Sequence, residues 1–325
     1  MKYLTLLIIL ITMRGVCQDD DPSKFHPIHN PDQYFLPGTI LAWVSSSLNQ
    51  KQSSFQVYLS LANIYGEYNS NWTLQKDPNI WAITQQYTYY YGISNSIMVA
   101  FNLPVITQFS EGKSTTHLED AQIWLGYQIS NDTSNSWVPD SRLIFVQTFP
   151  TGNYTGLNPD KLVIDQTGEG AFQSGFTFVA SKSIKINDQI LNLTGSLTYS
   201  YPFSTEVKGF HAYGGGYETK GTAKPGQSIN ILISPQYTLN RKWTLGLDSS
   251  FIFQSPSAFS GGKGFDKDGF EATNTLPISY QLSLAPQVEY MPAPQVGLQW
   301  GVYFTFAGKN SPAFCSAIGL YYINF

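Results

Sequence analysis

Alternation of apolar and polar side chains with a period of two is the feature that most constrains the fold of this chain. Over residues 296–306, one set of alternate positions carries Leu, Trp, Val and Phe, and the other carries Gly, Gln, Tyr and Thr. Residues 276–290 repeat the pattern over a length that suits a tilted strand crossing a bilayer. Because successive side chains of a strand point to opposite faces, each segment predicts a strand with one apolar and one polar face.

The same pattern divides most of the chain into strands. Twelve segments carry it, namely residues 55–61, 81–91, 97–105, 121–129, 142–149, 172–180, 191–203, 229–237, 243–253, 276–290, 296–306 and a last strand that ends at Phe325. Short connections alternate with long polar ones such as 68–78, 107–117, 150–170, 204–225 and 255–274. We therefore expect an all-β protein, a transmembrane antiparallel up-and-down β-barrel of the outer-membrane type with about 12 strands, or alternatively about 14.

The composition agrees with a barrel that faces lipid outside and holds uncharged polar groups inside. Aromatic residues make up 15% of the chain and charged residues 12%, whereas charged residues are about 25% of a soluble domain. The formal net charge is −4, and loss of Lys2 and Arg14 with a leader would make the chain more negative. This charge argues against nucleic acid as a partner.

The amino-terminal residues predict a cleaved signal peptide. An apolar run over residues 3–13 is too short for a membrane helix and has the length of a signal-peptide core. A small-x-small site ends at Cys17, so we expect cleavage before Gln18, with lipid modification of Cys17 as the alternative. Cleavage would leave Cys315 as the one cysteine, without an intrachain disulfide. The predicted division is a signal peptide at 1–17, a periplasmic lead-in or luminal plug segment at 18–54 and a barrel at 55–325.

The last strand ends in alternating residues that include Tyr321, Ile323 and Phe325. This ending resembles the terminal strand of bacterial outer-membrane barrels, where a carboxyl-terminal aromatic is the signal read by the barrel-insertion machinery. The resemblance implies the cell outer membrane as the location, reached by secretion through the inner membrane. It also implies outer-membrane lipid and the insertion machinery as partners.

Few charged residues face inward by this alternation. Asp120, Asp248 and Glu289 are the expected inward acids, and Arg142 is a further candidate near a turn. Most other inward positions carry amides, which suits neutral solutes or a lumen that packs shut. The predicted solute pathway consists of Asp120, Trp124, Asp248, Gln281, Glu289 and Tyr303.

Tyrosine and tryptophan residues gather toward the predicted strand ends. One group is Tyr87, Tyr89, Tyr90 and Tyr91, next to a short turn. Amphipathic rings prefer the headgroup level of a bilayer. We expect most of these rings to form interfacial girdles.

Several short phrases, from the first third of the barrel to its middle, resemble the outer-membrane protein family associated with the meta-pathway of phenol degradation. They are Tyr91-Gly92-Ile93-Ser94, Leu103-Pro104, Leu118-Glu119-Asp120-Ala121, Phe149-Pro150-Thr151-Gly152 and Gly168-Glu169-Gly170. Glu119 departs from the family, which tends to have glycine at that place. The resemblance implies a transporter-like channel for passive uptake of small uncharged, aromatic or hydrophobic molecules. The matched residues at the expected pore mouth are Pro104, Pro150, Thr151 and Gly152.

Two other functions stay open at the level of the sequence. A barrel without transport would serve a structural or adhesive role through its outer loops. A barrel enzyme would need a histidine or paired acids at the rim, and His117 beside Glu119 and Asp120 is the best candidate. No recognisable serine phrase accompanies it, so no catalytic residue and no cofactor are predicted.

No metal site is predicted either. His26 and His29 lie near several acids, but Pro27 between them and the lack of a regular element favour a solvated tail. Residues 266–271 begin like a calcium loop, yet Phe270 stands at a ligand position and Glu271 where glycine is required. The glycine-rich segments 214–216 and 261–264 are expected to be flexible loop tips.

Overall fold

The computed structural model describes residues 39–132, 137–187, 189–293 and 295–325. The predicted signal peptide, its cleavage site, His26 and His29 lie outside these residues. Strands dominate the described chain, and helix is confined to a 3-10 turn, η1 (Pro159–Lys161), and a short helix, α2 (Leu162–Asp165). No helix in the described ranges is long and apolar enough to cross a bilayer.

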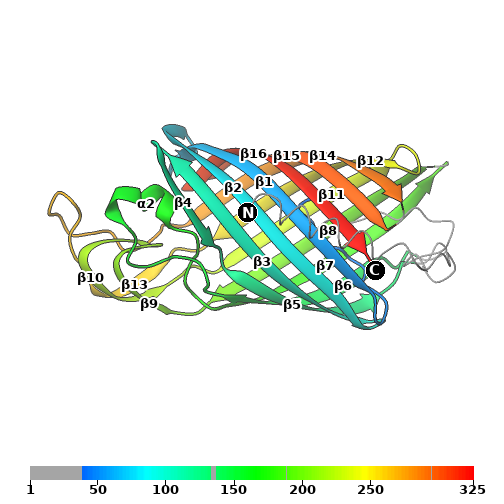
Figure 1. Cartoon of the computed structure of the whole chain (residues 1–325), viewed down its shortest axis with the longest axis horizontal. Coiled ribbons are helices and arrows are strands. Elements are labelled where there is room, and N and C mark those ends of the chain that lie inside the picture. The colour runs from blue at the N-terminus through cyan, green and yellow to red at the C-terminus, as the bar shows by residue number, and fades with distance from the viewer. Residues whose placement is uncertain (1–38, 133–136, 188, 294) are drawn as a thin grey trace, which may run out of the picture.

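Twelve antiparallel strands close into a barrel, as the alternation predicts, and the alternative of fourteen is wrong. Each strand pairs with its neighbours in chain order around the wall, and β1 pairs with β16 to close it, with Phe55 opposite Ile323 (Figure 1). The strands are β1 (Ser53–Tyr68), β2 (Leu74–Ser94), β3 (Ile97–Ser110), β5 (Ala121–Ser130), β6 (Asp140–Phe149), β7 (Gln173–Ile186), β8 (Gln189–Pro202), β11 (Ser228–Thr238), β12 (Trp243–Gln254), β14 (Ser279–Ala293), β15 (Val296–Lys309) and β16 (Ser311–Asn324).

The two faces of the wall differ in the way the alternation predicts. On β15, Trp300 and Val302 are exposed on the outer face, whereas Gln299 and Thr305 are buried on the inner face. Leu and Ile residues of β8, β11 and β12 continue the apolar exterior. A closed barrel leaves no unpaired sheet edge, which is why strands of this kind can sit in hydrocarbon.

Several strands extend beyond their apolar segments, which is a correction to the expected loops. Residues 68–78 and 107–117 were expected as long outer loops, but β1, β2 and β3 extend into them. Residues 113–118 form β4 (Lys113–Leu118), which folds back on β3 as a hairpin. Backbone pairing does not require apolar side chains, so polar residues prolong the ladder outside the lipid-facing band.

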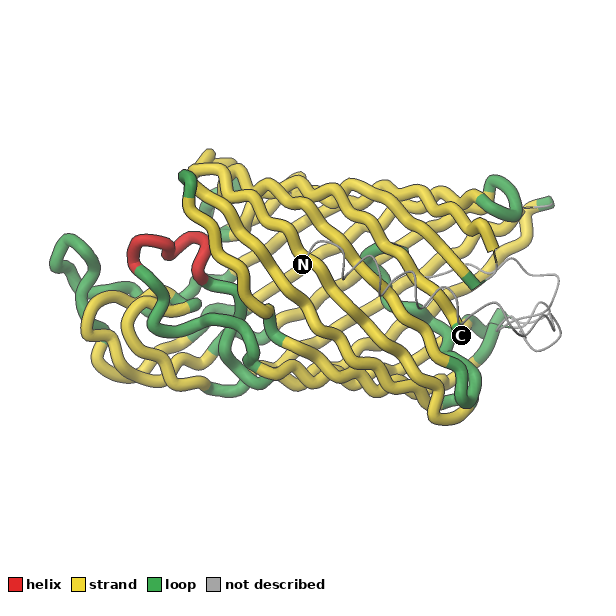
Figure 2. Tube along the Cα trace, in the orientation of Figure 1, coloured by secondary structure: helices red, strands yellow, loops and turns green. Residues whose placement is uncertain are grey.

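The outer loops form a small second sheet at the end of the barrel drawn on the left in Figure 1. Its strands are β9 (Thr205–His211), β10 (Gly214–Lys224) and β13 (Ala258–Gly262), in the order β13-β10-β9. Val207, Tyr213 and Ala223 form part of its buried core. The expectation that segments 214–216 and 261–264 are flexible tips is wrong in part, because they begin β10 and end β13. Figure 2 shows these strands clustered beyond the rim of the main barrel.

Replacement of an outward residue by lysine tests the lipid-facing assignment. Ile233 lies in the middle of β11 and is 61% exposed on the apolar exterior. We expect Ile233→Lys to lower the free energy of unfolding in lipid vesicles by about 2–4 kcal/mol, because a cation would face hydrocarbon. Urea unfolding followed by tryptophan fluorescence measures the change. Phe270→Lys, at an outer-loop residue that is 72% exposed, is the control and should change stability little.

Candidate functional site

Residues 39–48, called the luminal segment below, cross the inside of the barrel. The amide of Ile40 donates to Gln287 Oε1 at 2.8 Å and the amide of Leu41 to Asp248 Oδ2 at 2.9 Å. At the other end of the segment, the amide of Ser47 donates to Gln128 Oε1 at 2.8 Å. The wall residues come from β12 and β14 on one side and from β5 on the other. The luminal segment is therefore held by side chains of distant strands.

Hydrogen bonding to the wall explains why the luminal segment needs no secondary structure of its own. Its backbone groups would otherwise lie buried without partners, at a cost comparable to lost hydrogen bonds. Asp248 supplies one such partner, and its carboxylate also accepts from Ser234 Oγ and, at 3.0 Å, from Gln287 Nε2. The inward acid predicted from the sequence thus anchors the luminal segment.

A chamber of about 770 Å³ lies inside the barrel beside the luminal segment. The luminal segment borders it through residues 39–44, and the outer loop between β6 and β7 borders it through residues 166–169. Amide and hydroxyl side chains of the wall alternate with aromatic rings around it. The rings and amides include Gln56, Tyr58, Gln86, Tyr90, Gln122, Trp124 and Tyr322.

Asp120 joins the chamber rim to the outer loop. Its Oδ1 accepts from the amide of Gly152 and its Oδ2 from the amide of Glu169, both at 2.9 Å. Thr151 adds a second link, since its Oγ1 donates to the carbonyl of Glu119 at 2.6 Å. Three segments that are far apart in the sequence, around residues 119–120, 151–152 and 169, therefore meet at one place on the rim.

Close backbone packing at this junction requires glycine. A Cβ on Gly152 would lie 2.7 Å from the Cα of Gly168, and a Cβ on Gly168 would lie 2.4 Å from Asp120 Oδ1. Neither contact can be relieved by a change of side-chain rotamer alone, because both involve backbone or a carboxylate that is fixed by amides. The two glycines thus allow the loop to lie directly on Asp120.

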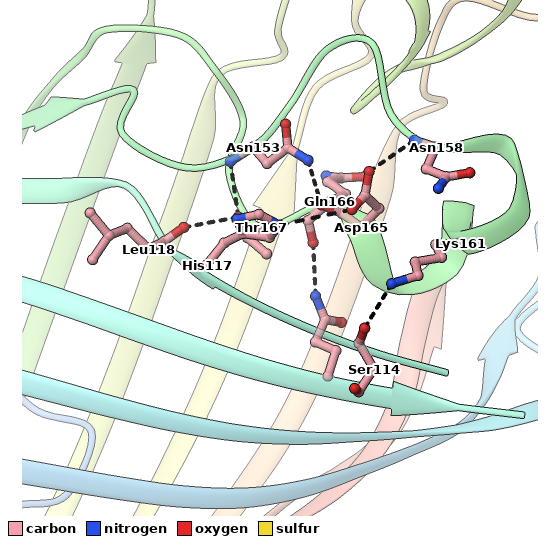
Figure 3. Close-up of polar contacts among 10 residues, drawn as sticks. Ser114, His117, Leu118, Asn153, Asn158, Lys161, Asp165, Gln166 and Thr167 are labelled. Carbon is pink, nitrogen blue, oxygen red and sulfur yellow. Dashed lines mark hydrogen bonds and ion pairs between the residues drawn. The ribbon is translucent and has the colours of Figure 1, made fainter. Parts of the chain in front are cut away.

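The outer loop is also fastened to the hairpin of β3 and β4, as Figure 3 shows. Lys161 Nζ donates to the carbonyl of Ser114 at 3.0 Å, and Thr167 Oγ1 donates to the carbonyl of Leu118 at 2.9 Å. His117 Nε2 lies 3.9 Å from Asp165 Oδ1, on the same surface. His117 therefore approaches an acid of the outer loop.

The pathway and pore-mouth residues predicted from the sequence fall into four groups. Asp120, Trp124 and Pro104 line the chamber, and Pro150, Thr151 and Gly152 lie at the rim junction or beside it. Asp248 holds the luminal segment. Elsewhere on the inner wall, Gln281 Nε2 donates to Tyr303 OH at 3.4 Å, and Glu289 Oε1 accepts from Tyr322 OH at 3.0 Å.

Sequence reasoning missed part of the chamber wall. Tyr90 was expected in an interfacial girdle, but it lines the chamber, and its hydroxyl donates to Gln56 Oε1 at 3.1 Å. The alternation on β2 could have placed Tyr90 inside the barrel. Tyr90 shares one face of the strand with Thr88 and Gln86, whereas Tyr89 and Tyr91 are exposed on the opposite face. Glu169 and Trp43 were also missed.

The carboxylates at the outer end of the chamber lie in a partly dehydrated environment. Burial, together with the smaller effect of the nearby charge of Asp120, raises the pKa of Glu119 to about 7. Burial and Asp120 also raise the pKa of Glu169, while a hydrogen bond from Gln173 lowers it. Glu119 lies between β4 and β5, outside the strands that cross the membrane. It is therefore a group whose charge changes near neutral pH.

The closed antiparallel barrel of twelve strands is a fold that is also found in a solved outer-membrane protein. An outer-membrane channel from Pseudomonas putida superimposes with a TM-score of 0.66 over 88% of this chain and 100% of that one, at 13% sequence identity. A monoaromatic hydrocarbon channel, CymD, covers 85% of this chain and 89% of its own at a TM-score of 0.42 and 9% identity. No family model and no curated protein sequence matches the chain. The likeness to the first of these structures supports the fold.

Proposed function

We propose that this protein is an outer-membrane channel for passive uptake of small uncharged, aromatic or hydrophobic molecules. The observation that carries the proposal is the chamber of about 770 Å³ within the lumen, lined by both aromatic rings and amides. Rings contact apolar parts of a solute, and amides hydrogen-bond to its polar groups without attracting ions. A wall of this kind suits neutral molecules that carry a ring.

We further propose that the chain carries a cleaved signal peptide and is inserted through its carboxyl-terminal aromatic strand. The apolar exterior of the strands supports a membrane location. Membership in the family associated with the meta-pathway of phenol degradation is part of the same proposal. It is supported by the contacts among Asp120, Gly152 and Glu169, because the phrases that resemble the family meet there.

Passage through this channel requires displacement of the luminal segment. The segment borders the chamber, and polar side chains of the wall hold it through a small number of hydrogen bonds, two of them made by Gln128. Such bonds contribute about 0.5–1.5 kcal/mol each, so a partial release of the segment costs little compared with unfolding the barrel. Solute would thus move from the outer mouth through the chamber and past the displaced segment.

Solute flux into protein-containing liposomes tests the proposal. We expect faster swelling with arabinose and with phenyl glucoside, a ring-bearing solute that does not cross lipid unaided, than in protein-free liposomes. A trisaccharide serves as the control for leakage and should stay excluded. Equal swelling with and without the protein, for every solute, would contradict transport.

A structural or adhesive barrel is the second candidate, and the ordered outer sheet favours it. Tyr217, Phe265 and Phe270 are exposed on or beside that sheet, which is unusual for a surface that contacts only water. This function predicts that liposomes with the protein stay impermeable. It also predicts that removal of residues 258–272 abolishes binding to a cell or matrix surface.

The raised pKa of Glu119 gives the channel a pH dependence. At about pH 6 the carboxyl is mostly neutral and at about pH 8 mostly ionised, since its pKa is about 7. We expect the ratio of cation to anion permeability to rise about two-fold between these pH values. Reversal potentials in planar bilayers measure the ratio. Glu119→Gln should flatten the dependence, and a dependence that survives this substitution would exclude Glu119 as its source.

A further inference from the structure

A buried guanidinium without a counter-charge lies in the chamber wall. Arg142, from β6, is 1% exposed and lines the chamber. Its Nη1 donates to the carbonyl of Ser46 at 3.0 Å, but its Nε has no hydrogen-bond partner. Across the described ranges, no carboxylate forms an ion pair with it. A buried charge in this condition is costly, and a ligand that supplies the opposite charge would remove much of that cost.

The wall is shaped to hold Arg142 in this place. Gly126 of β5 faces the lumen next to it, and a Cβ at Gly126 would lie 3.3 Å from Arg142 Cδ and 3.4 Å from its Nε. Arg142 pairs with Gln128 of β5, which follows Gly126 by two residues along that strand. The arginine side chain therefore runs along the wall toward Trp124, over the space that glycine leaves.

Aromatic and apolar side chains surround the region toward which Arg142 extends. The ring centroids of Trp43 and Trp124 lie 4.6 Å apart in an edge-to-face arrangement, and those of Tyr90 and Trp124 lie 5.8 Å apart. Ile144 and Val146 are buried against the two tryptophans. The region thus combines one cation with a wall that suits a flat ring.

The other charged residues that line the chamber are acids at its outer end. They are Glu119, Asp120 and Glu169. Asp120 is occupied by two amides, and Glu169 Oε2 accepts from Gln173 Nε2 at 2.7 Å. These groups repel an anion, so the negative end of a ligand would lie at Arg142 and away from the rim.

We infer that the chamber binds small aromatic carboxylates, with the carboxylate on Arg142 and the ring against Trp43, Tyr90 and Trp124. The terminal N–H groups of a guanidinium form a planar pair that matches the two oxygens of a carboxylate. The ring would fill the space beside the two tryptophans. This inference rests on the proposed function as a channel for ring-bearing molecules, and it differs from that proposal in the charge of the solute, because the ring carries an ionised acid and is not neutral.

Binding of benzoate and of benzamide, its neutral isostere, tests the inference. Calorimetric titration of the folded wild-type protein in detergent should give an affinity for benzoate about ten-fold higher than for benzamide, because only benzoate pairs with the charge. Arg142→Gln should remove this preference, and Arg142→Lys should keep part of it. Trp124→Leu should weaken the binding of both compounds alike.

Several results would overturn the inference. Equal affinities of the wild-type protein for the two compounds would do so, even if Arg142→Gln failed to fold. A preference that survives in Arg142→Gln, or a loss that affects benzoate and benzamide equally, would show that Arg142 acts only by holding the luminal segment. Tight benzoate binding by a protein that conducts no solute would support the binding site at Arg142 and contradict the proposed transport function.

Discussion

We expect removal of residues 18–48 to raise the single-channel conductance of the protein about ten-fold, because this deletion takes the luminal segment out of a barrel that is wide enough for water. The luminal segment borders the chamber and bonds to Gln287, Asp248 and Gln128. Water can replace the lost hydrogen bonds, so the wall should keep its fold. Heat-modifiable migration on gels checks that the variant is folded before its conductance is measured in planar bilayers.

The matched control removes residues from the outer end without touching the luminal segment. Glu111 and Gly112 form the tip of the hairpin between β3 and β4. Their deletion should leave conductance within the scatter of the wild-type protein. An unchanged conductance in the variant that lacks residues 18–48 would mean that the segment does not limit passage.

Asp120→Ala should release the outer loop between β6 and β7 from the barrel rim. The substitution removes the acceptor for the amides of Gly152 and Glu169. Loss of these two charge-assisted bonds should lower the free energy of loop opening by about 2–4 kcal/mol. Cleavage by trypsin after Lys161 reports the opening, and its rate should rise about 30-fold or more, in proportion to the open population.

Asp160→Ala is the control for this experiment, because Asp160 is an exposed acid in the same loop. It removes one negative charge, as Asp120→Ala does, and should leave the cleavage rate nearly unchanged. The cleavage rate of Asp120→Asn should lie between those of Asp120→Ala and the wild-type protein, because the amide oxygen of asparagine can still accept a hydrogen bond. Equal cleavage of Asp120→Ala and the wild-type protein would show that other contacts, such as that of Thr167, suffice to hold the loop.

The barrel wall could be predicted because its physics is local to each strand. In β15, the alternation between Trp300 and Gln299 marks the outer and inner faces directly. The strand ends could not be placed in this way, because β1 and β2 continue by backbone pairing after the apolar pattern stops. The sheet of β9, β10 and β13 was missed for a related reason, since its glycine-rich strands carry no clear alternation.

The chamber could be predicted only in part. The alternation on β5 predicts that Trp124 faces the lumen, and the place of Asp120 directly before β5 predicts that it lies at the rim. The course of the luminal segment depends instead on hydrogen bonds to wall residues that are distant in the sequence. A segment that is held by Asp248, more than 200 residues away, has no periodic signal of its own. Arg142 was considered as an inward charge, yet the lack of a hydrogen-bond partner for its Nε depends on the whole arrangement around it.

A reversible lock on the luminal segment tests the central claim that solutes cross through the lumen. A Cβ at Gly301 would lie 2.8 Å from Cδ1 of Ile40, so Ile40→Cys with Gly301→Cys places a second sulfur in the space that the isoleucine leaves. Cys315→Ser in the same protein removes the exposed native thiol. We expect slow arabinose flux into liposomes under oxidising conditions and recovery of the flux on reduction. Equal flux in the two states, with the disulfide shown by mass spectrometry, would contradict it.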